Sequence, residues 1–479
     1  MKLLRLVLVL NLFWILPGFQ GIAQPRSLFM SEQDEIELGK KNHPQVLAEF
    51  GGAYNNADLA EYIQSLGDYL ASTSERSNLK FTFTVLNSPI VNAFAVPGGY
   101  IYVTRGLLAL ADNEAEVAGV LAHEIGHIAA RHGAQRYDKT MLANIGMILL
   151  GIGTGSGEIA QAGGALASVL LQSYSREQEF EADELGVRYI ARANFDPQAM
   201  VSFLKKLQQE TSLEAKILGQ EDETDAMNIM ATHPRTVDRV AEAIREATKN
   251  QVKDPIVAQD IYLKKIDGII YGDSPDEGII RKRKFGHPQL NFSFEVPEDF
   301  RLFNFSDKVI AKGPQNSGIV FDQVKAGQYN SMTTYLKTWA KNNRLNSIES
   351  LTIKNHDAAT GLIRIRNKSG QFDQRLLAID YGDKIYRFLF VTPVKLTSRY
   401  DQAFKDTAYS FGPISQNDKD LFRPQIIKVI DVSASDTPQS LANKMPFEDY
   451  QLERFMVLNG LSANDKLRAG QKVKTIIQK

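Results

Sequence analysis

Two histidines and a glutamate stand in an apolar stretch, GVLAHEIGHIAA, at residues 119–130. Side chains four positions apart lie on one face of a helix, so His123 and His127 can direct their imidazoles at one point. Two neutral imidazoles suit zinc. Glu124 is displaced around the helix by roughly 100° from His123, so it would stand close to the metal without binding it. That is where the base for a zinc-bound water must be placed.

A catalytic zinc takes a third protein ligand, and the sequence contains no cysteine to supply it. The extended motif with a third histidine fails because the spacing after HEIGH is wrong, and His132 is expected to be a helix-end residue. The densest acidic helix is SREQEFEADELG at 175–186. There Glu179 and Asp183 share a face, so one could ligate and the other could orient a ligating imidazole. Spacing alone leaves both Glu179 and Glu181 open as the third ligand.

The composition is that of an ordinary folded protein and limits the class of partner. A chain of 479 residues is too long for one core, so we expect about two to four domains. The net charge of −1 gives no electrostatic basis for binding a nucleic acid. With no cysteine in the chain, disulfides, thiol catalysis and thiolate metal sites are excluded.

The N-terminus has the pattern of a secretory signal peptide, expected over residues 1–23. Lys2 and Arg5 precede the apolar run LVLVLNLFWIL, and small residues near Ala23 provide a cleavage site. This run is shorter than the ~20 residues that a membrane span needs, which favours a cleaved peptide over an anchor. Export without cysteine fits a bacterial periplasm. We therefore expect secretion across the inner membrane into the periplasm, with peripheral association with the outer membrane as an open alternative.

The remaining chain divides by periodicity, which predicts a multidomain fold. Residues 30–252 predict a mainly α-helical zincin-like metallopeptidase domain with a small β-sheet. Within it, the alternating stretches FTFTVLN at 81–87 and GGYIYVT at 98–104 predict an antiparallel pairing. The helix with HEIGH is expected to begin at a capping Asp112 and to end near Gly133.

Two smaller units follow. Short alternating strands over residues 277–415 predict an α+β domain with a PsbP-like pattern. Residues 425–479 resemble a LysM-like α+β module, because SDTPQSLA matches its opening turn and helix and LNGL with LRAGQKV matches its second half. The insert between these halves is longer than usual, which favours similarity of fold over glycan binding.

Four motifs occur in one order, namely NAFAVPGGYIYVTRGLL (92–108), AHEIGH, SREQEFEAD and THPRTVDR (232–239). Together they resemble the CAAX-prenyl-endopeptidase-like family of zinc metallopeptidases, of gluzincin type, and in particular its soluble periplasmic BepA-type members. The resemblance covers about residues 30–250. It implies one Zn²⁺ per chain, bound by His123, His127 and Glu179. It also implies that Glu124 is the general base, that Asp183 lies beside the ligands, and that Glu181 is no ligand.

Further site residues are expected in the first and last of these motifs. His233 is either a turn residue that starts a helix or, as the resemblance implies, a residue near the open position of the zinc. Arg239 matches an arginine of the same motif that could stabilise the oxyanion. Asn92, Ala93 and Phe94 form a run without proline. We expect this run to hold the substrate as an added strand.

The sequence thus predicts a secreted zinc metalloendopeptidase that hydrolyses peptide bonds, with misfolded or misassembled cell-envelope proteins as substrates. The outer-membrane assembly machinery and peptidoglycan are candidate partners, and nucleic acid is not. One alternative is a chaperone-like or scaffold protein with a latent protease site. Another is a cell-wall-associated binder acting through the LysM-like tail. The intact set of His123, Glu124, His127 and Glu179 favours the enzyme, because a scaffold has no need of the base.

Overall fold

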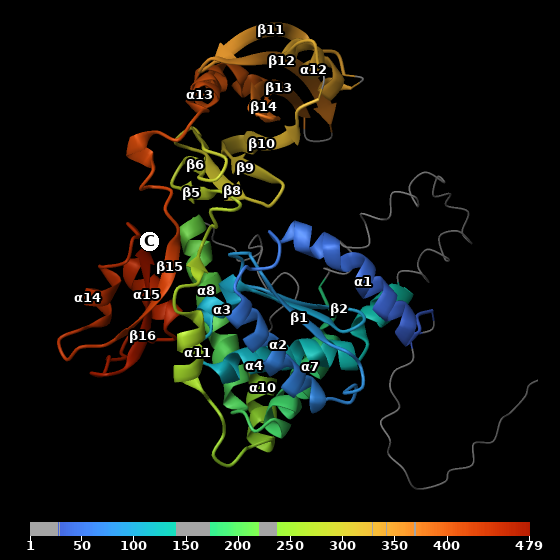
Figure 1. Ribbon diagram of the computed structural model, residues 1–479, viewed down its shortest axis with the longest axis vertical. Helices are drawn as coiled ribbons and strands as arrows, with labels where there is room; N and C mark the ends of the chain where they lie inside the picture. The colour runs from blue at the N-terminus through green and yellow to red at the C-terminus, as the bar shows by residue number, and fades with distance from the viewer. Residues whose placement is uncertain are drawn as a thin grey trace, which may run out of the picture.

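The computed structural model describes residues 27–139, 173–219 and 237–479, apart from residues 28, 328, 342, 368 and 369. The expected signal peptide and His233 lie outside the described residues. The described chain is multidomain, with helices and several β-sheets (Figure 1). Within these ranges, no helix is both long enough and apolar enough to cross a membrane.

The first unit is mainly helical and contains one small sheet. A continuous buried core joins its helices to that sheet. The sheet consists of β1 (Thr82–Leu86), β2 (Ala93–Val96) and β3 (Tyr100–Thr104). The helices are α1 (Glu32–Glu49), α2 (Ala57–Ser72), α3 (Arg105–Leu110), α4 (Glu114–Ala129), α7 (Arg176–Arg192), α8 (Gln198–Leu218), α10 (Val237–Lys249) and α11 (Gln259–Ile266).

The order of strands in this sheet is β1-β3-β2, and its pairing is mixed. β2 pairs antiparallel with β3, but β1 and β3 run parallel. The predicted antiparallel pairing of these two stretches is therefore wrong. Alternation of apolar and polar residues indicates that one face of a strand is buried. The same alternation occurs whether the neighbouring strand is parallel or antiparallel, so it could not predict the direction of pairing.

The turn between β2 and β3 rests directly on α1. Gly98 and Gly99 have φ values of 89° and 90°, a conformation that residues with a side chain rarely adopt. A Cβ on Gly98 would lie 2.5 Å from the carbonyl oxygen of Glu35 on α1. The glycines therefore let the turn approach α1 closely.

The helix that carries HEIGH, α4, begins and ends inside the predicted limits. Asn113, and not Asp112, is its N-cap, and the Asn113 side chain accepts a hydrogen bond from the backbone N–H of Glu116. The helix ends at Ala129, because Arg131 adopts a left-handed conformation with φ of 56°. Gly133 lies in the helical segment that follows.

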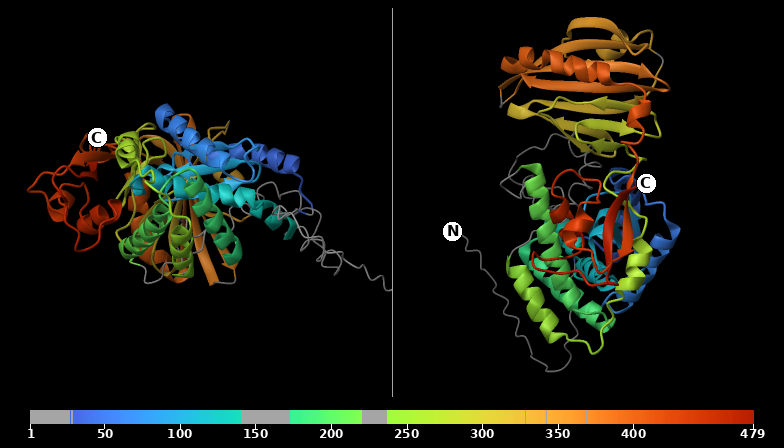
Figure 2. Two further views of the ribbon diagram at one scale, coloured as in Figure 1. Left: turned by 90° about the horizontal axis from the view of Figure 1, so that it is seen from below. Right: turned by 90° about the vertical axis from the view of Figure 1, so that its left-hand side faces the viewer.

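The middle unit is a seven-stranded sheet in the order β11-β12-β13-β14-β10-β9-β8, with a second sheet, β5-β6-β7, beside it. One face packs against α13 and β7 and the other against α12, and each face has its own buried cluster. It lies at one end of the long axis (Figures 1 and 2). Its elements are β5 (Ile279–Arg281), β6 (Lys284–His287), β7 (Phe292–Glu295), β8 (Arg301–Asn304), β9 (Lys308–Lys312), β10 (Gly318–Lys325), α12 (Met332–Ala340), β11 (Asn346–Ile353), β12 (His356–Asn367), β13 (Gly370–Tyr381), β14 (Lys384–Pro393) and α13 (Thr397–Ser410).

The last unit consists of β15 (Gln425–Asp431), α14 (Pro438–Ala442), α15 (Gln451–Leu458) and β16 (Lys472–Gln478). β15 pairs antiparallel with β16 and also with β4 (Ile270–Tyr271), a strand that precedes the middle unit. The apolar side chains of this unit belong to the same buried cluster as those of α4 and α8. The C-terminal unit is thus part of the core of the first unit, while its LysM-like character stays a prediction.

A buried lysine joins the C-terminal unit to the start of α4. The Lys474 ammonium group, on β16, donates to the carbonyl oxygens of Ala109, Leu110 and Ala111 over 2.9, 2.9 and 2.6 Å. It also lies 3.0 Å from an Asp112 carboxylate oxygen. Burial lowers the pKa of Lys474 to about 8, although the Asp112 carboxylate acts in the opposite direction. The last strand of the chain thus holds the segment between α3 and α4.

We expect Lys474→Met to lower the free energy of unfolding by about 1–3 kcal/mol, because the carbonyls of Ala109 and Ala111 lose a buried donor, whereas Lys206 still serves Asp112 and Leu110. Lys472→Met is the matched control, since Lys472 lies on the same strand and pairs with Asp431 at the surface. It should change stability little. Urea unfolding followed by circular dichroism measures both, and equal effects would contradict the role given to Lys474.

Candidate metal centre

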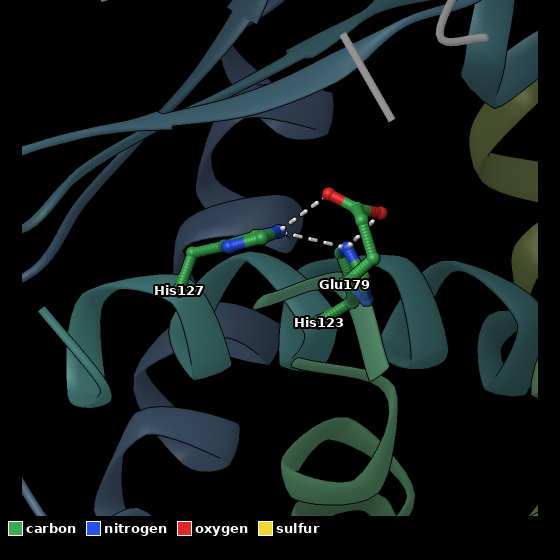
Figure 3. A group of neighbouring side chains, drawn as sticks. All are labelled: His123, His127 and Glu179. Carbon is green, nitrogen blue, oxygen red and sulfur yellow. Dashed lines mark hydrogen bonds and ion pairs between the residues drawn. The ribbon is translucent and has the colours of Figure 1, made fainter. Parts of the chain in front are cut away.

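Three buried side chains from two helices converge on one point (Figure 3). His123 and His127 extend from α4, and Glu179 extends from the first turn of α7. The two imidazole Nε2 atoms are 3.0 Å apart. A carboxylate oxygen of Glu179 lies 3.7 Å from the His123 Nε2, and the other lies 3.5 Å from the His127 Nε2.

The two imidazole nitrogens lie near the separation expected at a tetrahedral zinc ion, and each of them has a different oxygen of the Glu179 carboxylate within 3.7 Å. Two donor atoms that each lie about 2.1 Å from one ion at the tetrahedral angle are about 3.4 Å apart. The shortest of the three separations given above is 3.0 Å and the longest is 3.7 Å. Two nitrogen donors and one carboxylate also suit zinc better than calcium or magnesium, which prefer sets of oxygen ligands. Three protein ligands would leave a fourth position for water or substrate.

Glu124 lies within the same helix and is fully buried, with no solvent-exposed surface. It is not one of the three residues whose ligand atoms converge. This placement agrees with the expected position of a base beside the metal. Its catalytic role stays a prediction, because position alone tests no proton transfer.

His123 is oriented by a carboxylate on α7. Its Nδ1 lies 2.9 Å from an oxygen of Asp183, and this leaves Nε2 for the metal. Burial alone would raise the pKa of Asp183, but Arg239 and His123 hold it below its usual value. Asp183 is thus kept as a carboxylate that can accept the Nδ1–H of His123.

Arg239, on α10, contacts the carboxylates of the site. It donates two hydrogen bonds to the Asp183 carboxylate, from Nε and from Nη2, each over 2.7 Å, in a bidentate contact. Its Nη1 lies 2.5 Å from a Glu179 oxygen. Arg239 therefore holds the ligand carboxylate and its neighbour, whereas its predicted contact with an oxyanion stays a prediction.

The second ligating imidazole has neighbours that the sequence reasoning missed. His132, expected only to be a helix-end residue, has its Nδ1 2.8 Å from the Nδ1 of His127. The His132 Nε2 lies 3.1 Å from an oxygen of Glu181. The only signal in the sequence was a histidine five residues after His127, and a helix that continued unbroken would turn such a residue away.

An aromatic ring covers the same imidazole. Tyr174 stacks on His127 with ring centroids 3.9 Å apart and an angle of 16° between the planes. The guanidinium carbon of Arg136 lies 4.1 Å from the centroid of Tyr174. Burial raises the pKa of Tyr174 to about 12. A tyrosine directly before the acidic motif was a signal that could have suggested this contact.

The predicted substrate strand lies at the edge of the small sheet, where β2 has β3 as its neighbour. Asn92 accepts a hydrogen bond from the N–H of Thr104, so in the antiparallel register these two residues form a hydrogen-bonded pair. Because such pairs alternate, Ala93 and Ala95 direct their N–H and C=O groups away from β3. Ala95 and His127 line the same small cavity, so this edge lies beside the ligands.

The helical unit is similar in sequence to known metallopeptidases. Residues 57–247 match the model of peptidase family M48. The chain is 33% identical over 222 residues to the beta-barrel assembly-enhancing protease of Escherichia coli (strain K12), which covers 44% of this chain and 43% of that relative. It is 28% identical over 224 residues to the mitochondrial metalloendopeptidase OMA1 of Schizosaccharomyces pombe, covering 46% of this chain and 63% of that one.

These matches support the matched residues as a metalloendopeptidase domain. The chain spans less than half the length of the first curated relatives it matches. Among solved structures, a solution structure of cyanobacterial PsbP (CyanoP) from Synechocystis has 12% identity and a TM-score of 0.24, covering 30% of this chain and 98% of that one. A score this low carries no argument, so the PsbP-like pattern stays a prediction.

If Glu179 and not Glu181 is the third ligand, Glu179→Gln should lower bound zinc sharply after dialysis, because a neutral amide binds zinc much more weakly than a carboxylate. Glu181→Gln, the matched control two residues away, should keep about one zinc per chain. Inductively coupled plasma mass spectrometry of the purified variants measures this. The reverse pattern would move the ligand to Glu181.

Proposed function

We propose that this chain is a zinc-dependent endopeptidase that acts on misfolded or misassembled proteins of the cell envelope. The observation that carries the proposal is the convergence of His123, His127 and Glu179 at separations suited to zinc, with Glu124 buried in the same helix. The match to peptidase family M48 supports the same reaction. We also propose that the chain belongs, within the zinc metallopeptidases, to the CAAX-prenyl-endopeptidase-like enzymes, as the four sequence motifs indicate.

In the proposed mechanism, His123, His127 and Glu179 would hold a zinc ion, which would supply Lewis acidity for the scissile carbonyl and for the attacking water. Glu124 accepts the proton of the attacking water and passes it to the leaving amine. Asp183 accepts a hydrogen bond from the Nδ1–H of His123 and so leaves the lone pair of its Nε2 available for a metal. Arg239 holds Asp183 and Glu179 in place.

The substrate backbone adds as a further strand to the edge of β2 that faces away from β3, where no other described strand pairs. Of the three predicted residues, Ala93 is the one whose N–H and C=O point away from β3, and Asn92 and Phe94 instead face β3 in the antiparallel register. Pairing through backbone groups reads little side-chain sequence. It therefore suits an enzyme whose substrates share unfolded backbone and not a motif.

The location and the partners are proposed from the sequence and from a relative. The N-terminal pattern of a cleaved signal peptide supports secretion into the periplasm. The similarity to the beta-barrel assembly-enhancing protease of Escherichia coli supports the envelope as the place of action. Outer-membrane assembly machinery is a candidate partner on the same basis.

The C-terminal unit is proposed to have a LysM-like fold, supported by its order of strand, two helices and strand. Its buried contacts with α4 and α8 favour a structural role over an independent glycan-binding role. A chaperone-like protein with a latent site is the alternative that the following experiment separates from the enzyme.

Glu124→Gln should abolish cleavage of casein, because the amide cannot accept the proton of the attacking water. It should still bind about one zinc per chain, since Glu124 is not a ligand. Treatment of the wild type with a chelator, followed by added zinc, provides the control for metal dependence. Loss of zinc from Glu124→Gln would overturn its assignment as the base, and wild type without any proteolysis would favour the latent scaffold.

Ala93→Pro should raise KM for an unfolded substrate or abolish its cleavage, because proline removes an N–H that points outward from the edge strand. Ala93→Ser, which keeps that N–H and nearly the same volume, is the control and should cleave at close to the wild-type rate. Zinc content of both variants should stay close to wild type, and thermal melting shows whether each variant folds, since Ala93 is fully buried. Full activity of a folded Ala93→Pro variant would rule out strand addition.

A further inference from the structure

The two ligating histidines are oriented by different groups. The Nδ1 of His123 meets a buried carboxylate directly, that of Asp183, over 2.9 Å. The Nδ1 of His127 meets another imidazole instead, that of His132, over 2.8 Å. Ligating histidines commonly direct their second nitrogen at a carboxylate, a carbonyl or a water, so a second histidine in this place needs an explanation.

The positions of the protons follow from the chemistry of the ring. Two imidazole nitrogens at hydrogen-bond distance need one donor and one acceptor. His127 must present a lone pair at Nε2 to bind a metal, so its proton is on Nδ1 and is donated to His132. The proton of His132 is then on Nε2, and Glu181 accepts it over 3.1 Å. The opposite arrangement would place a proton on the His127 Nε2, facing the His123 Nε2.

This chain of contacts runs from the metal site to the surface. His132 is fully buried, and its ring reaches two polar partners, one at each nitrogen. The side chain of Glu181 is 53% exposed, so this series of hydrogen bonds ends at a carboxylate in contact with water. The carboxylate of Glu181 thus lies at the surface, whereas the carboxylate of Asp183, which contacts His123, is buried.

The turn after α4 brings His132 back toward His127. Arg131 takes up a left-handed conformation with φ of 56°, so His132 does not continue the helix. The Arg131 guanidinium is held over 2.7 Å by Glu35 and over 2.7 Å by the carbonyl of Met30. The N-terminal helix α1 therefore supports the turn that aims His132.

We propose that His132 and Glu181 are positioning residues for the zinc ligand His127, and that they act as a relay from an exposed carboxylate through a buried imidazole. The inference rests on the proposed zinc site and deepens it. Glu181 selects the form of His132 that has its proton on Nε2. His132 in turn selects the form of His127 that presents Nε2 to the metal. Neither residue binds the metal.

The test is the zinc dissociation constant of the full chain, measured by competition with a chelator. His132→Leu and His132→Asn have nearly the same shape, but only asparagine places an acceptor oxygen where the imidazole has Nδ1. We expect His132→Leu to bind zinc about 10–100-fold more weakly than wild type. His132→Asn should recover most of this loss, which a merely structural role in filling space would not predict.

The exposed end of the relay has its own matched pair on α7. Glu181→Leu removes the acceptor of His132 and should weaken zinc binding, by at most about tenfold. Glu184→Leu makes the same change at another exposed glutamate of this helix, whose contact is Arg188, and should leave the affinity unchanged. The visible spectrum of the cobalt-substituted protein should change for Glu181→Leu and not for Glu184→Leu.

The outcomes separate the relay from the proposed function. Wild type that binds no zinc would overturn both. Wild type that binds zinc, with equal affinities in His132→Leu and His132→Asn, would overturn the relay and leave the proposed function standing. If His132→Leu fails to fold, the exposed pair decides, and equal affinities of Glu181→Leu and Glu184→Leu would overturn the relay.

Discussion

The close contact between α4 and α7 is the constraint on which the metal centre depends. A Cβ on Gly126 would lie 3.1 Å from the carbonyl oxygen of Ala182, and one on Gly186 would lie 3.1 Å from the backbone nitrogen of His123. Both glycines therefore let the helices approach more closely than side chains would permit. The ligand atoms converge to within 4.8 Å because of this approach. A wider spacing would leave Glu179 out of reach of the two imidazoles.

The same contact buries several charged groups, and these must compensate one another. A buried charge is costly unless a partner and hydrogen bonds satisfy it. Arg239 meets this requirement for Asp183 and Glu179 together, and burial and these carboxylates act in opposite directions on its own pKa, which is raised. An arginine on α10 and two carboxylates on α7 thus tie a third helix to the site.

The position of α4, which carries His123 and His127, depends on contacts far from these two residues. α4 begins where Lys474, near the end of the chain, binds the preceding carbonyls, and the turn after α4 is held by Glu35 on α1. The two ends of one helix are therefore fixed by the first and the last described elements of the chain. This arrangement makes the C-terminal unit part of the core of the first unit, and its apolar residues share one buried cluster with those of α4.

Local periodicity was enough to place His123, Glu124 and His127, because residues four apart on one helix share a face whatever the rest of the chain does. The choice between Glu179 and Glu181 already required a resemblance, since both lie on one acidic helix and only its rotation against α4 separates them. The parallel pairing of β1 with β3, the Arg239 contacts and the relay through His132 join segments that are distant in sequence or separated by a break in a helix. The periodicity of apolar residues predicts which face of a helix or strand is buried, but it does not predict which helix or strand packs against that face. The sequence by itself therefore determined that His123, Glu124 and His127 share one helix and that Glu179 and Asp183 share one face of another. The convergence of Glu179 and not Glu181 on the two imidazoles, and the contacts of Arg239 and His132, were decided by tertiary packing, because they depend on how α4, α7 and α10 lie against one another.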